Sequence, residues 1–486
     1  MRTALVLAAL LAPPRPAGAF LAFPPPGLLP PPSFGAPAAP AAWGLTSTAV
    51  PEPAPPPPAA SNGAGGTGMV GSSFNLVKAC VGAGILSLPS GVAALSSSTT
   101  AIVPAVALLA ALGGVSGYSF YLIGKMCRRT GADSLTELWA RTVSPKSESL
   151  VTLCTFFTPL GAALAYSIIL ADTFTLLAST FGLSAVTRTM SLLTVTGTTL
   201  FPLCLLSNLS ALAPVSVVGV GGIVTTAAFM AYRALGSYAP GAALTATLAP
   251  ALRPAFSAAP AKLLSPSALV LVSMAATAFL SHFNAPSFHA ELRDNTDGRF
   301  KRLALLGFGG TFALSAAMMA AGFLTFGGAS SGVILNNYSA SDAGATLCRL
   351  LTGVSVVGSY PFIFSATRDS LLRLLGKETR NAKGGVPVKA TTALLAAITA
   401  VASVLKNAGF VISFNGAIMG SAIIYIFPPL MFLSLLRRDK QAGVAMTGKL
   451  RAEKAFNIGM VVLGVFAALA GGTVSVLDSF LPHLLA

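Results

Sequence analysis

Apolar runs of about 20 residues recur from Ser72 almost to the end of the chain, with short polar segments between them. As an α-helix, a run of that length crosses the ~30 Å hydrocarbon core of a bilayer. Only 9% of the residues are charged and 54% are hydrophobic, so a water-soluble globule of this composition could not cover its surface with polar groups. The runs also lack the alternation of membrane β-strands. The sequence therefore predicts an all-α, polytopic membrane protein.

Eleven such runs define the predicted membrane helices, because backbone groups in lipid must pair within their own segment. Lys and Arg collect in cytoplasmic loops, and 21 of them fall in the loops after even-numbered spans against 5 in the other loops. We therefore place the N-terminus in the cytoplasm and the C-terminus on the opposite side. The net charge of +16 then needs no nucleic-acid partner. The predicted spans are residues 72–95, 101–126, 149–180, 187–207, 213–235, 266–291, 302–326, 343–367, 388–405, 409–434 and 455–480.

Residues 1–70 form a separate region ahead of the membrane domain at 71–486. Their Pro- and Ala-rich runs, such as PEPAPPPP, have no periodic apolar face, so we expect a disordered tail. A short apolar run after Arg2 and the small residues before Phe20 also fit a targeting leader. Tail and leader remain alternatives, and the plasma membrane, the vacuole and the plastid envelope remain open as locations.

The first and sixth spans are predicted to be broken in mid-membrane. The first contains VGAGILSLPSG (81–91) and the sixth contains FLSHFNAPSFHAEL (279–292). Non-helical backbone at that depth survives only where it lines a cavity or is buried in protein, and its free N–H groups can bind a carboxylate. Close packing through small residues would explain a single break. Two breaks five spans apart instead predict a 5+5 inverted repeat plus one extra helix, with a site near the membrane midplane.

Four ionisable residues lie inside the predicted spans, where each is costly in lipid and should face protein or water. Asp172 and His282 can change charge, so they are candidates for proton coupling or, equally, for fixed hydrogen-bonded groups. Lys78 lies in the first span. Arg349 lies near the outer surface, where we expect it to snorkel or to pair with Asp342.

Catalytic chemistry is not predicted. We find no nucleophile–base pair and no paired carboxylates, and the three His and five Cys are scattered without metal-ligand spacing. We therefore expect no enzyme, no metal site and no cofactor. The sequence Asn337-Tyr338-Ser339, in a predicted outer loop, matches a glycosylation acceptor.

Four segments carry recognisable motifs in a fixed order: SSFNLVKACVGAGILSLPSGVA (72–93), SHFNAPSFHAELRD (281–294), GFLTFGGASSGVILNNY (322–338) and SYPFIFSATRDSLLRLL (359–375). Together they resemble the amino acid/auxin permease family, eukaryotic amino acid transporters with the LeuT-like fold. The resemblance covers about residues 70–481. It implies transport of neutral amino acids driven by a cation gradient.

The resemblance also implies where the substrate binds. The substrate carboxylate would meet backbone N–H groups of the first break, and side chains of the sixth span would shape the pocket. The implied substrate-binding residues are Gly82, Ala83, Gly84, Ile85, Phe279, His282 and Asn284. The candidates for ion coupling, from the resemblance and from the charges inside the spans, are Lys78, Asp172, His282 and Ser359.

We predict the coupling ion from one position at which this sequence differs from the sodium-coupled branch of that family. Lys78 stands where that branch tends to have Asn, and a fixed ammonium would repel sodium. Ser359 retains a hydroxyl position of the sodium site. We therefore expect a proton-coupled, sodium-independent symporter of a small-molecule amino acid, embedded in the lipid bilayer. A sodium-coupled symporter and a non-transporting amino acid sensor are the alternatives, and the oligomeric state is open.

Overall fold

The computed structural model describes residues 66–206, 213–258, 265–377 and 385–484. The predicted tail or leader lies outside the described residues up to residue 65. Every helix described below belongs to the unit Ala60–Ala486, one of the two into which the chain divides. Regular structure in the described residues is helical, with two isolated bridges at Thr67–Leu292 and Ala255–Gly327. The all-α prediction is confirmed for this part of the chain.

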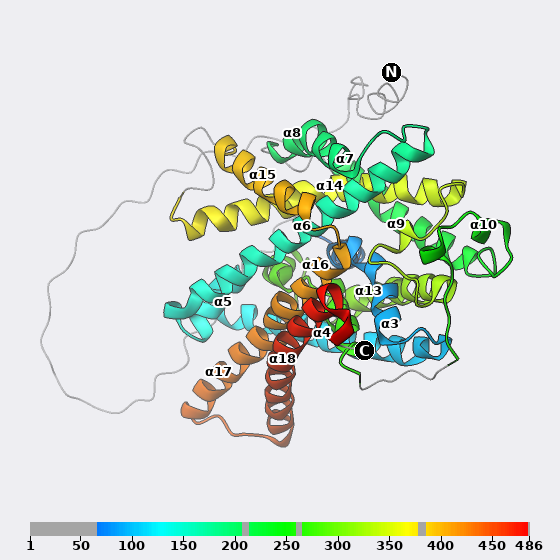
Figure 1. Cartoon of the computed structure of the whole chain (residues 1–486). Helices are drawn as coiled ribbons and strands as arrows, with labels where there is room; N and C mark the ends of the chain where they lie inside the picture. Colours follow the sequence, from blue (N-terminus) through cyan, green and yellow to red (C-terminus); the bar gives the residue numbers. More distant parts are fainter. Residues whose placement is uncertain (1–65, 207–212, 259–264, 378–384, 485–486) are drawn as a thin grey trace, which may run out of the picture. The chain divides into compact units, whose positions relative to one another are not determined.

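Apart from the short α5 and α10, the helices, coloured along the chain in Figure 1, fall into segments that coincide with the apolar runs. They are α2 (Met69–Cys80), α3 (Leu88–Leu95), α4 (Ile102–Thr130), α5 (Leu135–Thr142), α6 (Glu148–Thr180), α7 (Arg188–Val195), α8 (Phe201–Cys204), α9 (Ala213–Arg233), α10 (Ala243–Ala246), α11 (Ala268–Ala278), α12 (Ala285–Glu291), α13 (Asp297–Phe326), α14 (Ala343–Leu374), α15 (Val388–Val404), α16 (Ala408–Asn415), α17 (Phe427–Gln441) and α18 (Gly448–Phe480). Short 3-10 turns η1 (Ala83–Ser87) and η7 (His282–Asn284) and the π-helical stretches η4 (Thr196–Leu200) and η9 (Gly416–Ile426) join some of them.

Seven helical stretches among the described residues are long and apolar enough to cross a membrane, and α2 with α3 makes an eighth if this pair, bent by 49°, is one span. The protein is therefore a multi-pass membrane protein. The other three predicted spans coincide with α7 to α8, α9 and α15, of which α15 is a shorter apolar helix. The count of eleven crossings stays a prediction. The seven stretches are Thr99–Thr130, Pro145–Thr180, Ala268–Glu291, Asp297–Phe326, Ala343–Leu374, Ala408–Gln441 and Gly448–Phe480.

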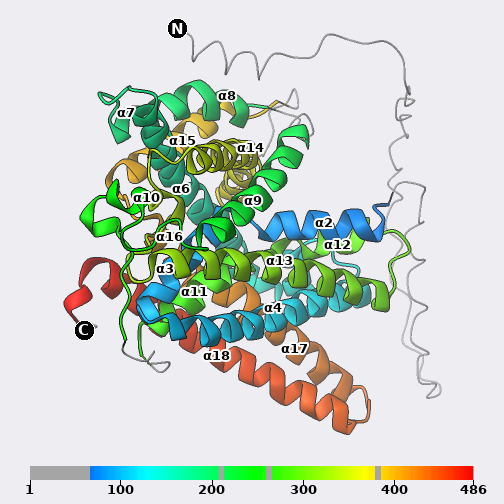
Figure 2. The ribbon, with the colours of Figure 1, turned by 90° about the vertical axis from the view of Figure 1, so that its right-hand side faces the viewer.

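Helix α14 packs between α6 and α9, which lie beside it in Figure 2. Small residues on α9 allow the close approach: a methyl group built on Gly219 would lie 2.7 Å from Ser355 Oγ of α14. On the other side, Ser167 of α6 and Tyr360 of α14 share a buried hydrogen bond of 3.0 Å between their hydroxyls. This three-helix packing positions one face of α14 against the first interrupted helix.

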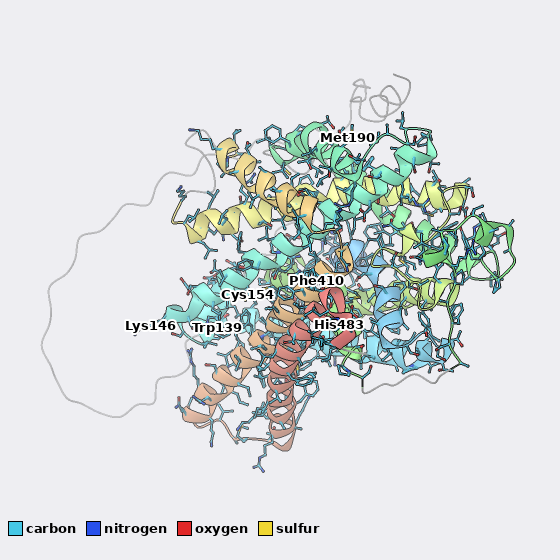
Figure 3. The ribbon with its side chains drawn as sticks, in the orientation of Figure 1. Trp139, Lys146, Cys154, Met190, Phe410 and His483 are labelled. Carbon is cyan, nitrogen blue, oxygen red and sulfur yellow. The ribbon has the colours of Figure 1, made fainter. Side chains whose placement is uncertain are left out.

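Helix α5 is a short amphipathic helix outside the membrane spans. Ser134 caps it by accepting a 3.2 Å hydrogen bond from the Glu137 N–H, while the Glu137 carboxylate accepts one from the Asp133 N–H at 2.9 Å. Trp139, labelled in Figure 3, buries its ring against Phe427 of α17, with ring centroids 5.1 Å apart. The cap fixes where the helix begins, and the tryptophan anchors it to the membrane domain.

Two expectations about the segment before α14 are wrong. Asp342 does not pair with Arg349; its Oδ1 accepts a 2.8 Å hydrogen bond from Arg233, and it caps α14 through the Gly344 N–H at 3.0 Å. Arg349 does not snorkel to the surface, because it is 1% exposed and donates to three backbone carbonyls of this segment. The Nη1 and Nη2 atoms of Arg349 therefore hold the segment before α14 in shape.

The glycosylation acceptor is also not accessible. Asn337 is fully buried, donates from Nδ2 to the Ala329 carbonyl at 2.7 Å and accepts from the Ser331 N–H at 2.9 Å. Its amide nitrogen is therefore used to hold the turn after α13 in shape.

Candidate functional site

The first interruption lies between α2 and η1. Helix α2 ends at Cys80, and Gly82 has an extended backbone with φ −103° and ψ −170° before η1 begins at Ala83. The first N–H groups of a helix have no partner within that helix. The backbone of Ala83 and Gly84 therefore presents donors in the interior of the membrane domain, at the position predicted to hold a carboxylate.

The second interruption lies between α11 and α12 and touches the first. Helix α11 ends at Ala278, and a non-helical stretch and η7 separate it from α12. A methyl group built on Gly84 would lie 3.5 Å from the Thr277 methyl, so the end of α11 packs directly against η1. Thr277 also donates to the Ile412 carbonyl of α16 at 2.7 Å. The two interrupted helices thus meet near the middle of the domain.

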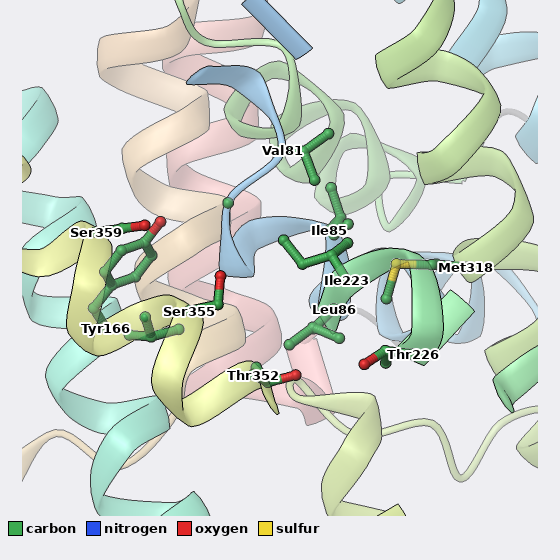
Figure 4. A pocket seen from close by; sticks show the side chains of 12 residues that line it. Val81, Ile85, Leu86, Tyr166, Ile223, Thr226, Met318, Thr352, Ser355 and Ser359 are labelled. Atoms are coloured by element: carbon green, nitrogen blue, oxygen red, sulfur yellow. The ribbon is translucent and has the colours of Figure 1, made fainter. Parts of the chain in front are cut away.

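A small cavity opens on the other side of the first interruption (Figure 4). Hydroxyl groups from α6, α9 and α14 surround one part of it, and apolar side chains of η1, α9 and α13 close the rest. The lining residues are Val81, Gly82, Ile85, Leu86, Tyr166, Ile223, Thr226, Met318, Thr352, Ser355, Val356 and Ser359. An interrupted backbone facing several hydroxyls is an arrangement that can bind both a carboxylate and a cation.

The cavity is closed in this conformation. Its volume is about 20 Å³, room for roughly one water molecule. Sites for small organic ligands are usually ~300–1,000 Å³. The Tyr166 hydroxyl lies directly over the interruption, since a methyl group built on Gly82 would be only 2.6 Å from that oxygen. A ligand of the usual size would therefore fit only after movement of Tyr166 or of the interrupted helix.

Three of the predicted site residues line this cavity: Gly82, Ile85 and Ser359. Gly84 faces α11, as described above. Ala83 precedes it in the same turn of backbone. The structure thus brings Gly82, Ile85 and Ser359 to one cavity.

The predicted residues of the sixth span lie elsewhere. Phe279 is fully buried and packs against Phe308 of α13, with ring centroids 6.2 Å apart. His282 is also fully buried, and its Nε2 lies 2.9 Å from the Ser116 carbonyl of α4. A carbonyl only accepts, so Nε2 carries the proton. Asn284 is half-buried in η7. None of these three residues is among those that line the cavity, and the contacts of Phe279 and His282 are those of packing groups.

The remaining charged candidates are also outside the cavity. Asp172 forms an ion pair with Arg188, Oδ1 to Nε 2.7 Å, and its other oxygen is 3.4 Å from the Asn336 amide. It lies six residues beyond Tyr166 on α6, about 9 Å along the helix axis. Lys78 is half-buried on α2, three residues before the interruption begins at Val81.

Four hydroxyl residues of the cavity were missed by sequence reasoning: Tyr166, Thr226, Thr352 and Ser355. A signal was present on α14. Thr352, Ser355 and Ser359 stand at positions i, i+3 and i+7, which places all three hydroxyls on one helix face. Nothing in the sequence connects that face with Gly82, because the two segments are far apart in the chain.

An interrupted helix beside a cavity lined by hydroxyl groups, in a multi-pass membrane domain, is typical of a membrane transporter. The family comparison agrees: residues 65–477 match the model described as "Transmembrane amino acid transporter protein". The match covers most of the chain, so this protein belongs to the family of transmembrane amino acid transporters. The family and the relatives are transporters and not enzymes.

The relatives are distant, and they match this chain over different shares of their length. The chain is 27% identical over 382 residues to "Putative sodium-coupled neutral amino acid transporter 11" of Danio rerio, covering 77% of this chain and 80% of the relative. It is 24% identical over 177 residues to "Vacuolar amino acid transporter 2" of Saccharomyces cerevisiae, covering 35% and 37%. A solved structure described as the inward-facing conformation of Mhp1 matches with a TM-score of 0.52 and 14% identity, over 85% of this chain and 91% of the other. That likeness shows the LeuT-like fold alone.

Proposed function

We propose that this protein carries neutral amino acids across a membrane by alternating access. The observation that supports the proposal most directly is the closed cavity at the first interruption, where Gly82 and Ile85 face Ser355 and Ser359. Free N–H groups of η1 would bind the substrate carboxylate, and carbonyls of the interrupted helices would bind its amino group. The same proposal includes eleven membrane crossings, an inverted repeat and a cytoplasmic N-terminus. It also includes breaks in the first and sixth spans, residues 72–95 and 266–291, at the substrate site.

Opening from the inner side would require one contact to break. Thr67, just before α2, accepts a backbone hydrogen bond from Arg293 at 3.0 Å and donates one to Glu291 at 2.9 Å. The Arg293 guanidinium adds a 3.1 Å bond to the Gly66 carbonyl. These bonds hold the start of α2 against the end of α12, so they would stabilise the closed state over one in which α2 swings away.

For the coupling ion we propose the proton, with sodium as the second candidate. The half-buried ammonium of Lys78 has no ion-pair partner within 4.0 Å among the described residues, so its charge would act against a bound cation nearby. Two observations favour sodium. Ser355 and Ser359 place two hydroxyls at the cavity, and several relatives carry names that describe them as sodium-coupled. Asp172 is a weaker candidate on this geometry, because it lies outside the cavity and its carboxylate is already paired with the Arg188 guanidinium.

The test is uptake by the purified protein in liposomes with an alkaline interior, using a mixed set of radiolabelled amino acids with and without sodium. We expect uptake of neutral amino acids that needs the pH gradient and does not change when choline replaces sodium. Uptake that scales with sodium would refute proton coupling and leave the transporter proposal in place. Substrate binding without any uptake would refute transport and favour an amino acid sensor.

A further inference from the structure

A second, much larger hollow lies away from the candidate site, between α4, α13 and α18. Figure 2 shows α4 and α13 running side by side, with α18 below them at an angle. The hollow has a volume of about 840 Å³ and opens to the outside of the protein. Its lining on α4 runs from Ala110 to Lys125, which is about 22 Å along the helix axis. One leaflet of the hydrocarbon core is about 15 Å thick, half of ~30 Å. The hollow is therefore a crevice long enough for an acyl chain.

The floor of this crevice is made by glycines. Gly113, Gly114 and Gly117 of α4 and Gly309 of α13 line it. Close helix packing is the usual reason for glycine in a membrane span. That reason does not apply to Gly114 or Gly309, because a methyl group built on either would meet no atom within 4 Å. Their missing side chains leave open space, and the space continues onto an exposed apolar face that includes Leu305 and Phe456.

Positive charge gathers at one end of the crevice. Lys125, Lys301 and Lys449 line it, one from each helix, together with a single carboxylate, Glu453. Glu453 is already engaged, by Lys125 at 3.7 Å and by the Tyr118 hydroxyl at 3.4 Å. Among the described residues, Lys301 and Lys449 have no carboxylate within 4.0 Å, and both are exposed.

Asp297, in the first turn of α13, is already hydrogen-bonded. The Tyr121 hydroxyl donates to Asp297 at 2.8 Å. The lining residues thus leave a surplus of two positive charges at the mouth of an otherwise apolar groove.

We propose that this crevice binds one anionic phospholipid, with its phosphate at Lys301 and Lys449 and an acyl chain over Gly114 and Gly309. An apolar groove inside a membrane span is filled by lipid or protein, and basic pockets between membrane helices attract acidic head groups. The lysines lie where α4 ends and where α13 and α18 begin, so the head group and the chain would lie in the leaflet at that end of the helices. The proposal does not depend on transport.

The test is the melting temperature of the delipidated, full-length protein in detergent, titrated with dioleoylphosphatidylglycerol, dioleoylphosphatidylcholine or soluble glycerol phosphate. We expect stabilisation by phosphatidylglycerol at the lowest concentration, weaker stabilisation by phosphatidylcholine, and none by glycerol phosphate. The double variant K301Q/K449Q should bind phosphatidylglycerol about 25-fold more weakly, at roughly fivefold for each lysine near the surface. The variant G114L should weaken binding of both lipids by filling the groove.

The matched controls make the same kinds of substitution at positions that do not line the crevice. K389Q/K440Q takes two exposed lysines from other helices, and G459L adds the same side chain to an exposed glycine of α18 with open space around it. Both controls should bind lipid as the unmodified chain does. The proposal is overturned if phosphatidylcholine stabilises as strongly as phosphatidylglycerol, if glycerol phosphate alone reproduces the effect, or if the controls lose as much binding as K301Q/K449Q. It is also overturned if lipid has no effect and the crevice is covered by a second copy in a dimer detected by light scattering.

Discussion

The substitution Gly82→Ala offers the sharpest test of the cavity geometry. The backbone does not require glycine there, because φ −103° and ψ −170° are open to any residue. The obstacle is Tyr166, whose hydroxyl would be 2.6 Å from the new methyl group, whereas real Cβ atoms stay at least 3.0 Å from such neighbours. The hydroxyl, the α6 backbone or the interrupted segment must then shift by at least 0.4 Å, the difference between these two distances.

The expected cost follows from that clash. Overpacking of a well-packed interior costs about 1–3 kcal/mol, so Gly82→Ala should destabilise the protein by that amount. Tyr166→Phe removes the clashing oxygen, after which the nearest ring atom to the methyl group is Cζ at 3.7 Å, an ordinary contact. By itself Tyr166→Phe should cost about 0.5–1.5 kcal/mol through the lost hydroxyl. The double variant should therefore be close to Tyr166→Phe alone, with a coupling free energy of about 1 kcal/mol or more.

The assay is thermal unfolding of the four purified proteins in one detergent, with the KM of amino acid uptake measured in parallel. Unfolding reports the steric clash whatever the protein transports, while KM reports whether the cavity is the substrate site. Additive effects, with coupling within about 0.5 kcal/mol of zero, would refute the proposed contact between Gly82 and Tyr166. Rescue of stability with no change of KM in any variant would place substrate binding elsewhere.

Three further predictions test other parts of the structure. Asp342→Asn keeps a capping side chain but leaves the Arg233 charge without its partner. Breaking a buried ion pair costs about 3–5 kcal/mol, and because the Arg233 side chain is 23% exposed we expect a loss of stability near the low end of that range. Thermal unfolding of the purified variant measures this loss. An unchanged melting temperature would mean that the pair contributes nothing. Lys78→Asn should make uptake respond to sodium, and a variant as indifferent to sodium as the unmodified chain would argue against a role for the ammonium. The hydrogen bond that the Asp133 N–H donates to the Glu137 carboxylate, together with the nearby Arg141 guanidinium, lowers the pKa of Glu137. The contribution of Glu137 to α5 is therefore present above its unfolded pKa of ~4.3 and is lost as pH falls through the lowered value. Hydrogen exchange of α5 should show this loss, which Glu137→Gln should abolish; the same loss in both proteins would contradict it.

The interruptions show how far local sequence reaches. Gly82, Gly84 and Pro89 predicted a break within residues 81–91, because these residues weaken or remove the helix at their own positions. In the structure α2 ends at Cys80 and α3 begins at Leu88. The helical segments could also be predicted from local sequence, because a membrane helix needs only a long enough run of consecutive apolar residues. The family resemblance then added Ser359, which the structure places at the cavity beside Gly82.

The partners of the polar residues could not be predicted in the same way. A polar residue in an apolar run shows that some partner must exist, because an unpaired one is costly in lipid. It does not show which partner. His282 bonds a carbonyl of α4, 166 residues earlier in the chain, and Asp172 pairs with Arg188. Each of these contacts depends on how whole helices pack.

The sequence by itself determined that this chain is a helical membrane protein of an amino acid transporter family. These properties depend on local backbone preference and on burial in lipid, which neighbouring residues decide. Only the tertiary structure decided that Tyr166 covers Gly82, that hydroxyls of α14 line the cavity, and that three lysines from three helices meet at one crevice. Those contacts join segments tens to hundreds of residues apart, and their distances follow from helix packing, which no local pattern records.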